Sequence, residues 1–394
     1  MLAAAYTAFG ATAYWAAHCS RRPDEWHLRR AVRLQPRNSE YRHQLGLYDL
    51  FALQDVNAAA TEFRQAISLN PHLARYWLDL ANAKQVIGDV DGQRHAIQQA
   101  VDAEPTNYPA AWEAANLLFA AGDVVRGLQV SKLVLQANPD RRVVDVCWRA
   151  ARDPELIVHN ALPSTASAHL LLLNFLVDQG EIDNAGKVWS ELLNLRQKFE
   201  TDAALPYVEQ LLKRREVEQA RQVWKSAVAA DSASPPETAA GNLVVNSNFE
   251  GRLLNGGFDW RFPSDPNTRV TLDSAEFRTA GRSLQVAFSG EPMSGPAMYQ
   301  LIPVEPDTSY DFSAYVKTEE IYTSSGPRFL IEDAYTAQPL AQTKPVVGTV
   351  QWNQDKIEFR TGPETRLLKL SLVQSPAGHI RGRMWVDELM LSRN

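Results

Sequence analysis

The histidines and cysteines of this sequence are not spaced for catalysis or for a metal centre. Its 8 histidines include no H-E-x-x-H phrase and no pair at positions i and i+4, the spacing with which one helix holds a zinc ion. Cys19 and Cys147 lie far apart, and neither belongs to a C-x-x-C phrase. The sequence also contains no G-x-S-x-G elbow, no G-x-G-x-x-G phrase and no phosphate-binding loop. We therefore predict that the protein is not an enzyme and that both cysteines are structural thiols.

The charge balance argues against nucleic acid as a partner. The chain has 40 lysines and arginines against 46 acidic residues, a formal net charge of -6, whereas a phosphate backbone requires a basic surface. Hydrophobic residues make up 45% and charged residues 22%, as in folded globular proteins. Because 394 residues exceed what one hydrophobic core usually supports, we expect two or three domains.

The N-terminal half contains a repeated phrase that ends in proline. AVRLQP, AISLNP, AVDAEP and VLQANP end at Pro36, Pro71, Pro105 and Pro139, a spacing of about 34 residues. Within a repeat, glycine and aspartate end a first helix and the proline ends a second, because neither glycine nor proline continues a helix well. Each helix pair leaves an apolar face that a neighbouring pair covers, so we predict a helical solenoid with a concave groove.

The phrase WLDLANAKQVIGD, from Trp77 to Asp89, resembles the tetratricopeptide repeat. The resemblance implies a repeat array over residues 21–230, with degenerate repeats in its last part and an irregular helical unit around VVDVCWRAARDPELIVHNALP. It also implies that Asn82 and Asn116, one repeat apart, face the groove and hydrogen-bond a bound protein or peptide. In the alternative interpretation, these asparagines are solvated or form bonds between helices.

From residue 243 onward, hydrophobic residues alternate with polar ones. The alternation is clear in SLQVAF, SYDFSAYV and LKLSLV, and turn residues such as glycine and proline separate these stretches. A period of two indicates half-buried strands, and no long amphipathic helix interrupts them. We predict a linker at residues 231–242, rich in small residues and proline, and an antiparallel β-sandwich or jelly roll at residues 243–394.

Several phrases of the β region resemble the jelly-roll carbohydrate-binding modules attached to many xylanases and cellulases. The phrases are NSNFEGRLLNGGFDWRF, AGRSLQVAFSG, YQLIPVEPDTSYDFSAYVKTE, TVQWNQDKIEFRTG and MWVDELML. The resemblance implies a carbohydrate ligand. It also implies that Glu250, in the N-x-x-F-E phrase, and Asp387, in the V-D phrase before Glu388, hold a structural calcium ion. In the alternative interpretation these carboxylates are solvated, since calcium requires six to eight oxygen ligands.

Sugar binding favours flat aromatic rings, which cover the C–H face of a pyranose, together with polar groups for its hydroxyls. Trp260, Trp352 and Trp385 lie within the phrases that define the fold, so we predict that they belong to the core. Other tyrosines and polar residues are then the glycan-binding candidates, namely Tyr299, Gln300, Tyr322, Arg328, Asp333, Tyr335 and Gln374.

Residues 1–20 contain the uncharged stretch LAAAYTAFGATAYWAA, which precedes His18 and the basic pair Arg21 and Arg22. The stretch is shorter than the about 20 apolar residues that span a bilayer, and no basic residue precedes it as in a signal peptide. It is either the remnant of a membrane anchor or signal, or the first helix of the array.

Together these patterns predict an adaptor that binds a protein through the repeat groove and a glycan through the β-sandwich, in polysaccharide export or assembly. The predicted location is at a membrane or in the periplasm or beyond it, rather than in the cytoplasm. The alternative is a scaffold for proteins alone, whose sandwich caps the array or docks on protein and binds no sugar.

Overall fold

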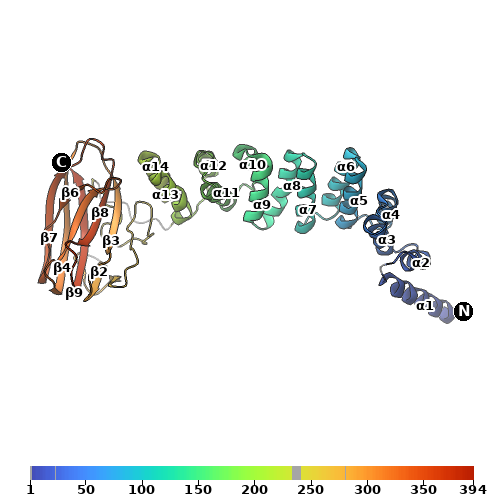
Figure 1. Ribbon diagram of the computed structural model, residues 1–394, viewed down its shortest axis with the longest axis horizontal. Helices are drawn as coiled ribbons and strands as arrows, with labels where there is room; N and C mark the ends of the chain where they lie inside the picture. Colours follow the sequence, from blue (N-terminus) through green and yellow to red (C-terminus); the bar gives the residue numbers. More distant parts are fainter. Residues whose placement is uncertain (1, 23, 233–240, 280) are drawn as a thin grey trace. The chain divides into compact units, whose positions relative to one another are not determined.

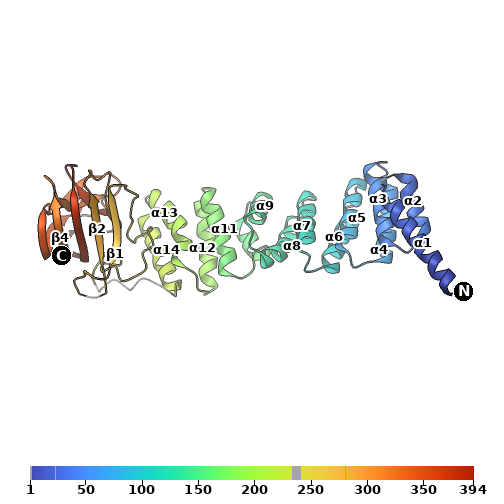
Figure 2. The same ribbon diagram turned by 90° about the horizontal axis from the view of Figure 1, so that it is seen from below.

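The computed structural model describes residues 2–22, 24–232, 241–279 and 281–394, which form helices and then strands (Figures 1 and 2). The chain forms two compact units. The first contains residues up to Phe175 together with Lys187–Glu191, and the second contains Leu176–Gly186 and Leu192–Asn394. The predicted order of a helical region followed by a β-sandwich is confirmed.

Successive helices of the first unit pack as neighbouring pairs, α3 with α4, α5 with α6 and α7 with α8. The helices that begin in this unit are α1 (Leu2–Ser20), α2 (Glu25–Leu34), α3 (Ser39–Phe51), α4 (Val56–Leu69), α5 (Ala74–Ile87), α6 (Val90–Ala103), α7 (Tyr108–Ala120), α8 (Val124–Ala137), α9 (Arg141–Ala151), α10 (Pro154–Asn160) and α11 (Ala166–Asp178). The short α9 and α10 occupy the stretch that departs from the repeat pattern. The helical region fits a repeat solenoid.

The turns inside each repeat follow from their glycine and aspartate residues. Gly88 ends α5 in the left-handed conformation, with φ of 84°, which glycine adopts without steric cost. Asp55, Asp89 and Asp123 immediately precede α4, α6 and α8 as N-caps, and each carboxylate accepts a hydrogen bond from a backbone N–H in the first turn of the helix. These caps fix where the second helix of each pair starts.

The core of the repeats is built from small residues and a few large ones. Ala59, Ala81 and Ala96 are almost completely buried, which lets helix backbones approach closely, and Phe63 fills the space beside them. Cys19 and Cys147 are both buried and form no disulfide. Among the described residues, no helix has the length and apolar character required to cross a membrane.

The second unit begins with helices and continues into two antiparallel sheets. The helices are α12 (Ile182–Asn194), which the first unit shares, a 3-10 turn (Thr201–Ala204), α13 (Leu205–Lys213) and α14 (Val217–Ala230). The strands are β1 (Thr268–Asp273), β2 (Ser283–Ser289), β3 (Met298–Pro303), β4 (Ser309–Tyr322), β5 (Pro327–Asp333), β6 (Pro339–Gln342), β7 (Gly348–Arg360), β8 (Leu367–Gln374) and β9 (Arg381–Arg393). Most of the predicted linker, residues 233–240, lies outside the described residues.

The two sheets pack face to face around one hydrophobic core. The order of the five-stranded sheet is β1-β2-β9-β4-β7, and that of the four-stranded sheet is β3-β8-β5-β6. Phe312 and Phe329, from opposite sheets, contact edge to face with ring centroids 5.3 Å apart. Trp260 is completely buried in this core, as predicted.

Helix α13 packs against the β-sandwich within the second unit. The Glu209 carboxylate accepts hydrogen bonds from both terminal nitrogens of Arg261, at 3.0 and 2.7 Å, and from the Gly257 N–H at 2.7 Å. From α14, the Trp224 ring meets Phe258 edge to face at 5.9 Å. These contacts place α13 and α14 beside the outer face of β3, where Arg261 lies over the Tyr299 ring.

Candidate functional site

Two of the predicted glycan-binding aromatics contact other parts of the protein instead of open solvent. The Tyr335 hydroxyl donates a hydrogen bond to the Leu212 carbonyl oxygen at the end of α13 (2.9 Å), and Arg215 lies over the ring. Tyr299 lies on β3 between the side chains of Arg261 and Lys369. Both rings therefore have cationic or helical neighbours on the face that could stack on a sugar.

Three of the predicted polar partners bind the protein's own backbone. Gln300 is completely buried, and its amide exchanges hydrogen bonds with the N–H and carbonyl of Val245 at 3.0 and 2.9 Å. Gln374 donates to the Ser325 carbonyl oxygen at 3.0 Å. Asp333 accepts N–H bonds in the β5–β6 turn. Burial raises the pKa of Asp333, but hydrogen bonds from Thr336 and Tyr335 in the turn and from the Thr365 side chain outweigh burial, so the net pKa lies below its usual value.

The remaining two candidates lie near the loop that follows β4. Tyr322 ends that strand and is 64% exposed. Arg328 lies on β5 and donates to the Ser325 hydroxyl at 3.1 Å. The structure thus brings Arg328 and Gln374 together around Ser325, whereas Asp333 is at the opposite end of β5. The seven predicted residues do not form one surface.

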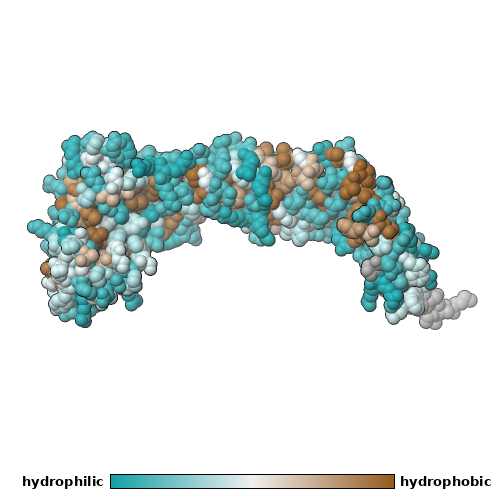
Figure 3. Space-filling model, in the orientation of Figure 1, coloured by the Kyte–Doolittle hydropathy of each residue, from teal (hydrophilic) through white to brown (hydrophobic). Residues whose placement is uncertain are grey.

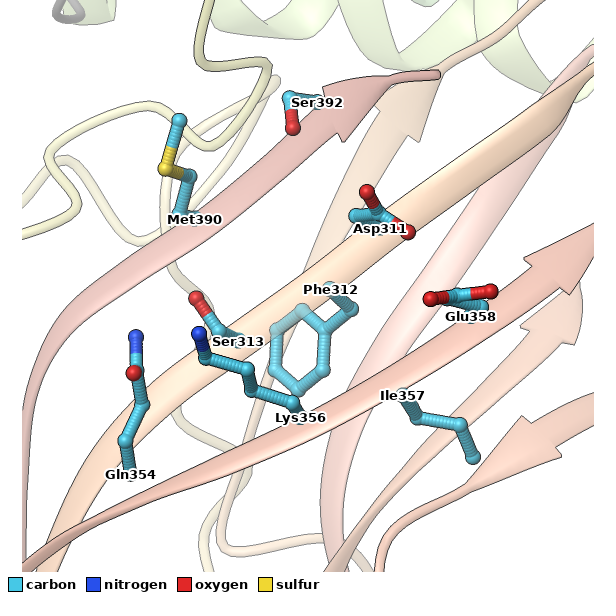
Figure 4. Close-up of a pocket in the computed structure, with 9 residues that line it drawn as sticks. All are labelled: Asp311, Phe312, Ser313, Gln354, Lys356, Ile357, Glu358, Met390 and Ser392. Atoms are coloured by element: carbon cyan, nitrogen blue, oxygen red, sulfur yellow. The ribbon is translucent and has the colours of Figure 1, made fainter.

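A groove of about 530 Å³ lies on the outer face of the five-stranded sheet (Figure 4). Its side chains come from three adjacent strands, β4, β7 and β9, and most of them are polar. The lining residues are Asp311, Phe312, Ser313, Gln354, Lys356, Ile357, Glu358, Met390 and Ser392. This groove was missed by our sequence predictions, although the alternation of TVQWNQDKIEFRTG places Gln354, Lys356 and Glu358 on a common face.

The groove holds two carboxylates directly opposite each other. Asp311 on β4 pairs in register with Glu358 on β7, and Lys356 lies opposite Ser313 two pairs along the strands, on the same face. Asp311 accepts one hydrogen bond, from the Asn394 amide at 3.0 Å. Like charges at directly opposed positions destabilise a sheet. A pair of this kind on an accessible face is therefore a feature that folding alone does not explain.

The other part of this sheet face is covered by the segment between β1 and β2. Arg278 lies over the Tyr315 ring at 4.4 Å, and Glu276 forms an ion pair with Lys317 at 2.6 Å. Trp385 is buried to 3% exposure on this outer face, where its indole N–H donates to Asp273 at 2.8 Å. The prediction that Trp385 is buried is confirmed, although a loop rather than the opposite sheet covers it; Trp352, also predicted to be in the core, is half-buried.

The two predicted calcium ligands lie near each other at the edge of this covered region. Asp387 accepts the N–H groups of Arg278 at 2.9 Å and of Glu388 at 2.8 Å. Glu250 accepts the Arg282 N–H at 2.9 Å. Burial, supplemented by the charges of Glu388 and Glu250, raises the pKa of Asp387 to about 6. Among the described residues, no cluster of three or more His, Cys, Asp or Glu side chains is arranged to hold a metal.

In the first unit, the two predicted groove asparagines are both half-buried on the first helices of their repeats. Asn116 donates to the Trp112 carbonyl oxygen of its own helix at 2.9 Å. Asn82 forms a hydrogen bond with the carboxylate of Glu113 on the next repeat. Desolvation, followed by the charge of Asp79, raises the pKa of Glu113, and the bond from Asn82 opposes this shift.

Part of the chain matches a known protein family. Residues 241–375 match the family model described as a carbohydrate binding domain. Among solved structures, a CBM4 module shares 10% identity over 38% of this chain and 99% of its own, with a TM-score of 0.30. TmCBM61, solved with β-1,4-galactotriose, shares 18% identity over 39% and 99%, with a TM-score of 0.28.

Another solved structure matches a larger share of the chain. PilF of Pseudomonas aeruginosa shares 12% identity over 57% of this chain and 90% of its own, with a TM-score of 0.28. The search of curated proteins gave no match. Residues 241–375 therefore match a carbohydrate-binding domain family, and they follow a helical region that fits a repeat solenoid.

Proposed function

We propose that this protein is a non-catalytic adaptor, which binds a glycan in the groove of the five-stranded sheet and a protein segment on its helical repeats. The glycan-binding part of the proposal rests on the opposed carboxylates of Asp311 and Glu358. Neighbouring hydroxyls of a sugar ring donate hydrogen bonds, and ionised carboxylates are strong acceptors of such bonds. A bound glycan would thus relieve the repulsion between the two groups.

The rest of the groove supplies complementary chemistry. Lys356 donates hydrogen bonds, and Gln354 both donates and accepts them, which suits the ring and hydroxyl oxygens of a sugar. Met390 is 43% exposed and offers an apolar contact for the C–H groups of the ring. The opposite sheet is a weaker candidate because α13 and α14 pack beside β3. Carbohydrate-binding modules of this type act mostly outside the cell, which supports a role in the export or assembly of a surface polysaccharide.

We also propose that Glu250 and Asp387 hold a structural calcium ion. In favour of this proposal, the buried Asp387 carboxylate lies near enough to Glu388 and Glu250 for their negative charges, together with burial, to raise its pKa. A divalent cation would compensate this charge and join the N-terminal segment of the domain to β9. Backbone carbonyls or water would have to complete the coordination, because calcium requires six to eight oxygens.

The proposed glycan site is tested with a glycan array probed by the full-length protein, followed by calorimetry on each positive sugar. We expect Glu358→Gln to weaken binding about tenfold, since one charge-assisted hydrogen bond is lost. Glu364→Gln, at an exposed position outside the groove, is the matched control. Tyr322→Ala distinguishes the two candidate regions, because loss of binding in that variant alone would move the site to the loop after β4.

The second candidate function is a scaffold for proteins alone. The packing of α13 and α14 against the sandwich favours it, because a β domain that covers the last helices of an array acts as a cap. An array with no positive glycan, obtained with folded protein in both calcium and chelator, would favour this function over the glycan-binding adaptor.

A further inference from the structure

The first helices of three consecutive repeats, α3, α5 and α7, present matching residues on one face. Positions spaced by three and four residues along a helix share a face, so each helix contributes a row of three. We call this surface the recognition face, and it consists of Gln44, Leu47, Phe51, Asp79, Asn82, Val86, Glu113, Asn116 and Ala120.

The recognition face carries two carboxylates from adjacent repeats. Asp79 is fixed in position by His43, whose Nε2 lies 2.5 Å from the carboxylate, while the Nδ1 of this buried histidine lies 2.8 Å from an Arg75 nitrogen. Glu113 projects from α7 near enough to Asp79 for their charges to interact. Within the described part of the chain, no basic side chain forms an ion pair with Glu113.

Exposed apolar side chains lie about two helical turns beyond these carboxylates on the same face. Phe51 at the end of α3 is 75% exposed, and Val86 at the same repeat position of α5 is 68% exposed. Ile87 and Val90 continue the apolar surface through the turn to α6, with 43% and 48% exposure. Hydrophobic residues are visible on the surface in this part of the helical region (Figure 3). Several exposed large apolar side chains on one part of a surface are typical of interaction sites.

We propose that the recognition face binds a protein segment in which a lysine or arginine is flanked by large apolar side chains. This inference rests on the proposed protein-binding role of the repeats and names the chemistry of the partner. The basic side chain lies between Asp79 and Glu113, where it offsets their mutual repulsion. The apolar side chains cover Phe51 and Val86, and the amides of Asn82 and Asn116 face the backbone of the segment.

The experiment is an array of random ten-residue peptides probed with the full-length protein and its variants. We expect the bound peptides to be enriched in a basic residue beside leucine, isoleucine or phenylalanine. Glu113→Gln weakens binding of the selected peptides about tenfold, as expected for loss of one charge-assisted contact. Phe51→Ser weakens binding and reduces the apolar preference, but leaves the basic preference intact.

Asp91→Asn is the matched control, because Asp91 is fully exposed on α6 and lies off the recognition face. Circular dichroism establishes that each variant is folded. Enrichment of acidic or neutral peptides, or unchanged affinity in Glu113→Gln, would overturn the basic-segment inference while the protein-binding role stands. If wild-type protein selects no peptide at all, the protein-binding role fails, and the glycan array remains an independent test of the β domain.

Discussion

Replacement of Glu209 by alanine is expected to loosen α13 from the β-sandwich. The Glu209 carboxylate accepts three hydrogen bonds, two from the Arg261 guanidinium and one from the Gly257 N–H. The side chain of Glu209 is 29% exposed and that of Arg261 is 14% exposed, so solvent screens their interaction only in part. Removing the carboxylate leaves a mostly buried guanidinium without its counter-ion, which costs about 2–4 kcal/mol in unfolding free energy.

The assay for this prediction combines urea unfolding with hydrogen exchange resolved by peptide over residues 205–230. Glu218→Ala is the control, since Glu218 on α14 is 64% exposed and pairs with Arg221 only three residues away. An exposed helix pair of this type contributes about 0.3–0.5 kcal/mol. In Glu209→Ala, exchange of α13 should accelerate; equal stability loss and equal exchange in the two variants would refute a docked α13.

Two further predictions concern the carboxylates of the β domain. Burial raises the pKa of Asp259 to about 6, against hydrogen bonds from the Leu254 N–H and other groups. The folded state therefore retains a proton that the unfolded state loses, so stability falls as pH rises from about 4 to about 6. Asp259→Asn should remove this pH dependence and raise the unfolding free energy by about 2–3 kcal/mol at pH 7. Urea unfolding at several pH values across that range measures both effects. For the proposed calcium site of Glu250 and Asp387, calcium chloride should raise the melting temperature of chelator-treated wild type but not of Asp387→Asn, and an equal rise in both would place the ion elsewhere.

The repeats and strands were predictable because their signals are local. The proline phrases and the glycine–aspartate turns determine where helices end within a single repeat, and alternation shows which side of a strand faces the core. By contrast, the sequence of one strand does not show which residues of a neighbouring strand lie opposite it. The opposition of Asp311 and Glu358 depends on the register of β4 against β7, which no pattern within either strand encodes. The groove could be found only once both strands were placed side by side.

The predicted aromatics illustrate the same limit. An exposed tyrosine on a sugar-binding sheet and a tyrosine that docks a helix have similar local sequences. The partner of Tyr335 is Leu212, more than a hundred positions earlier in the chain, and Tyr299 is next to Arg261 because the backbones of the two residues pair in an antiparallel bridge. Trp385 is buried as its phrase predicts, but no local pattern shows that a loop with Glu276 and Arg278 covers it on the outer face.

The packing of α13 and α14 has a consequence for how the two proposed binding surfaces combine. The helices belong to the same compact unit as the sandwich, whereas α3, α5 and α7 belong to the other unit. The sheet groove and the recognition face have no hydrogen-bonding partner in common among the described residues. Energetic effects of substitutions without shared contacts usually add. Glu358→Gln and Glu113→Gln should therefore each impair binding of one ligand and leave the affinity for the other unchanged, as an adaptor with two independent surfaces requires.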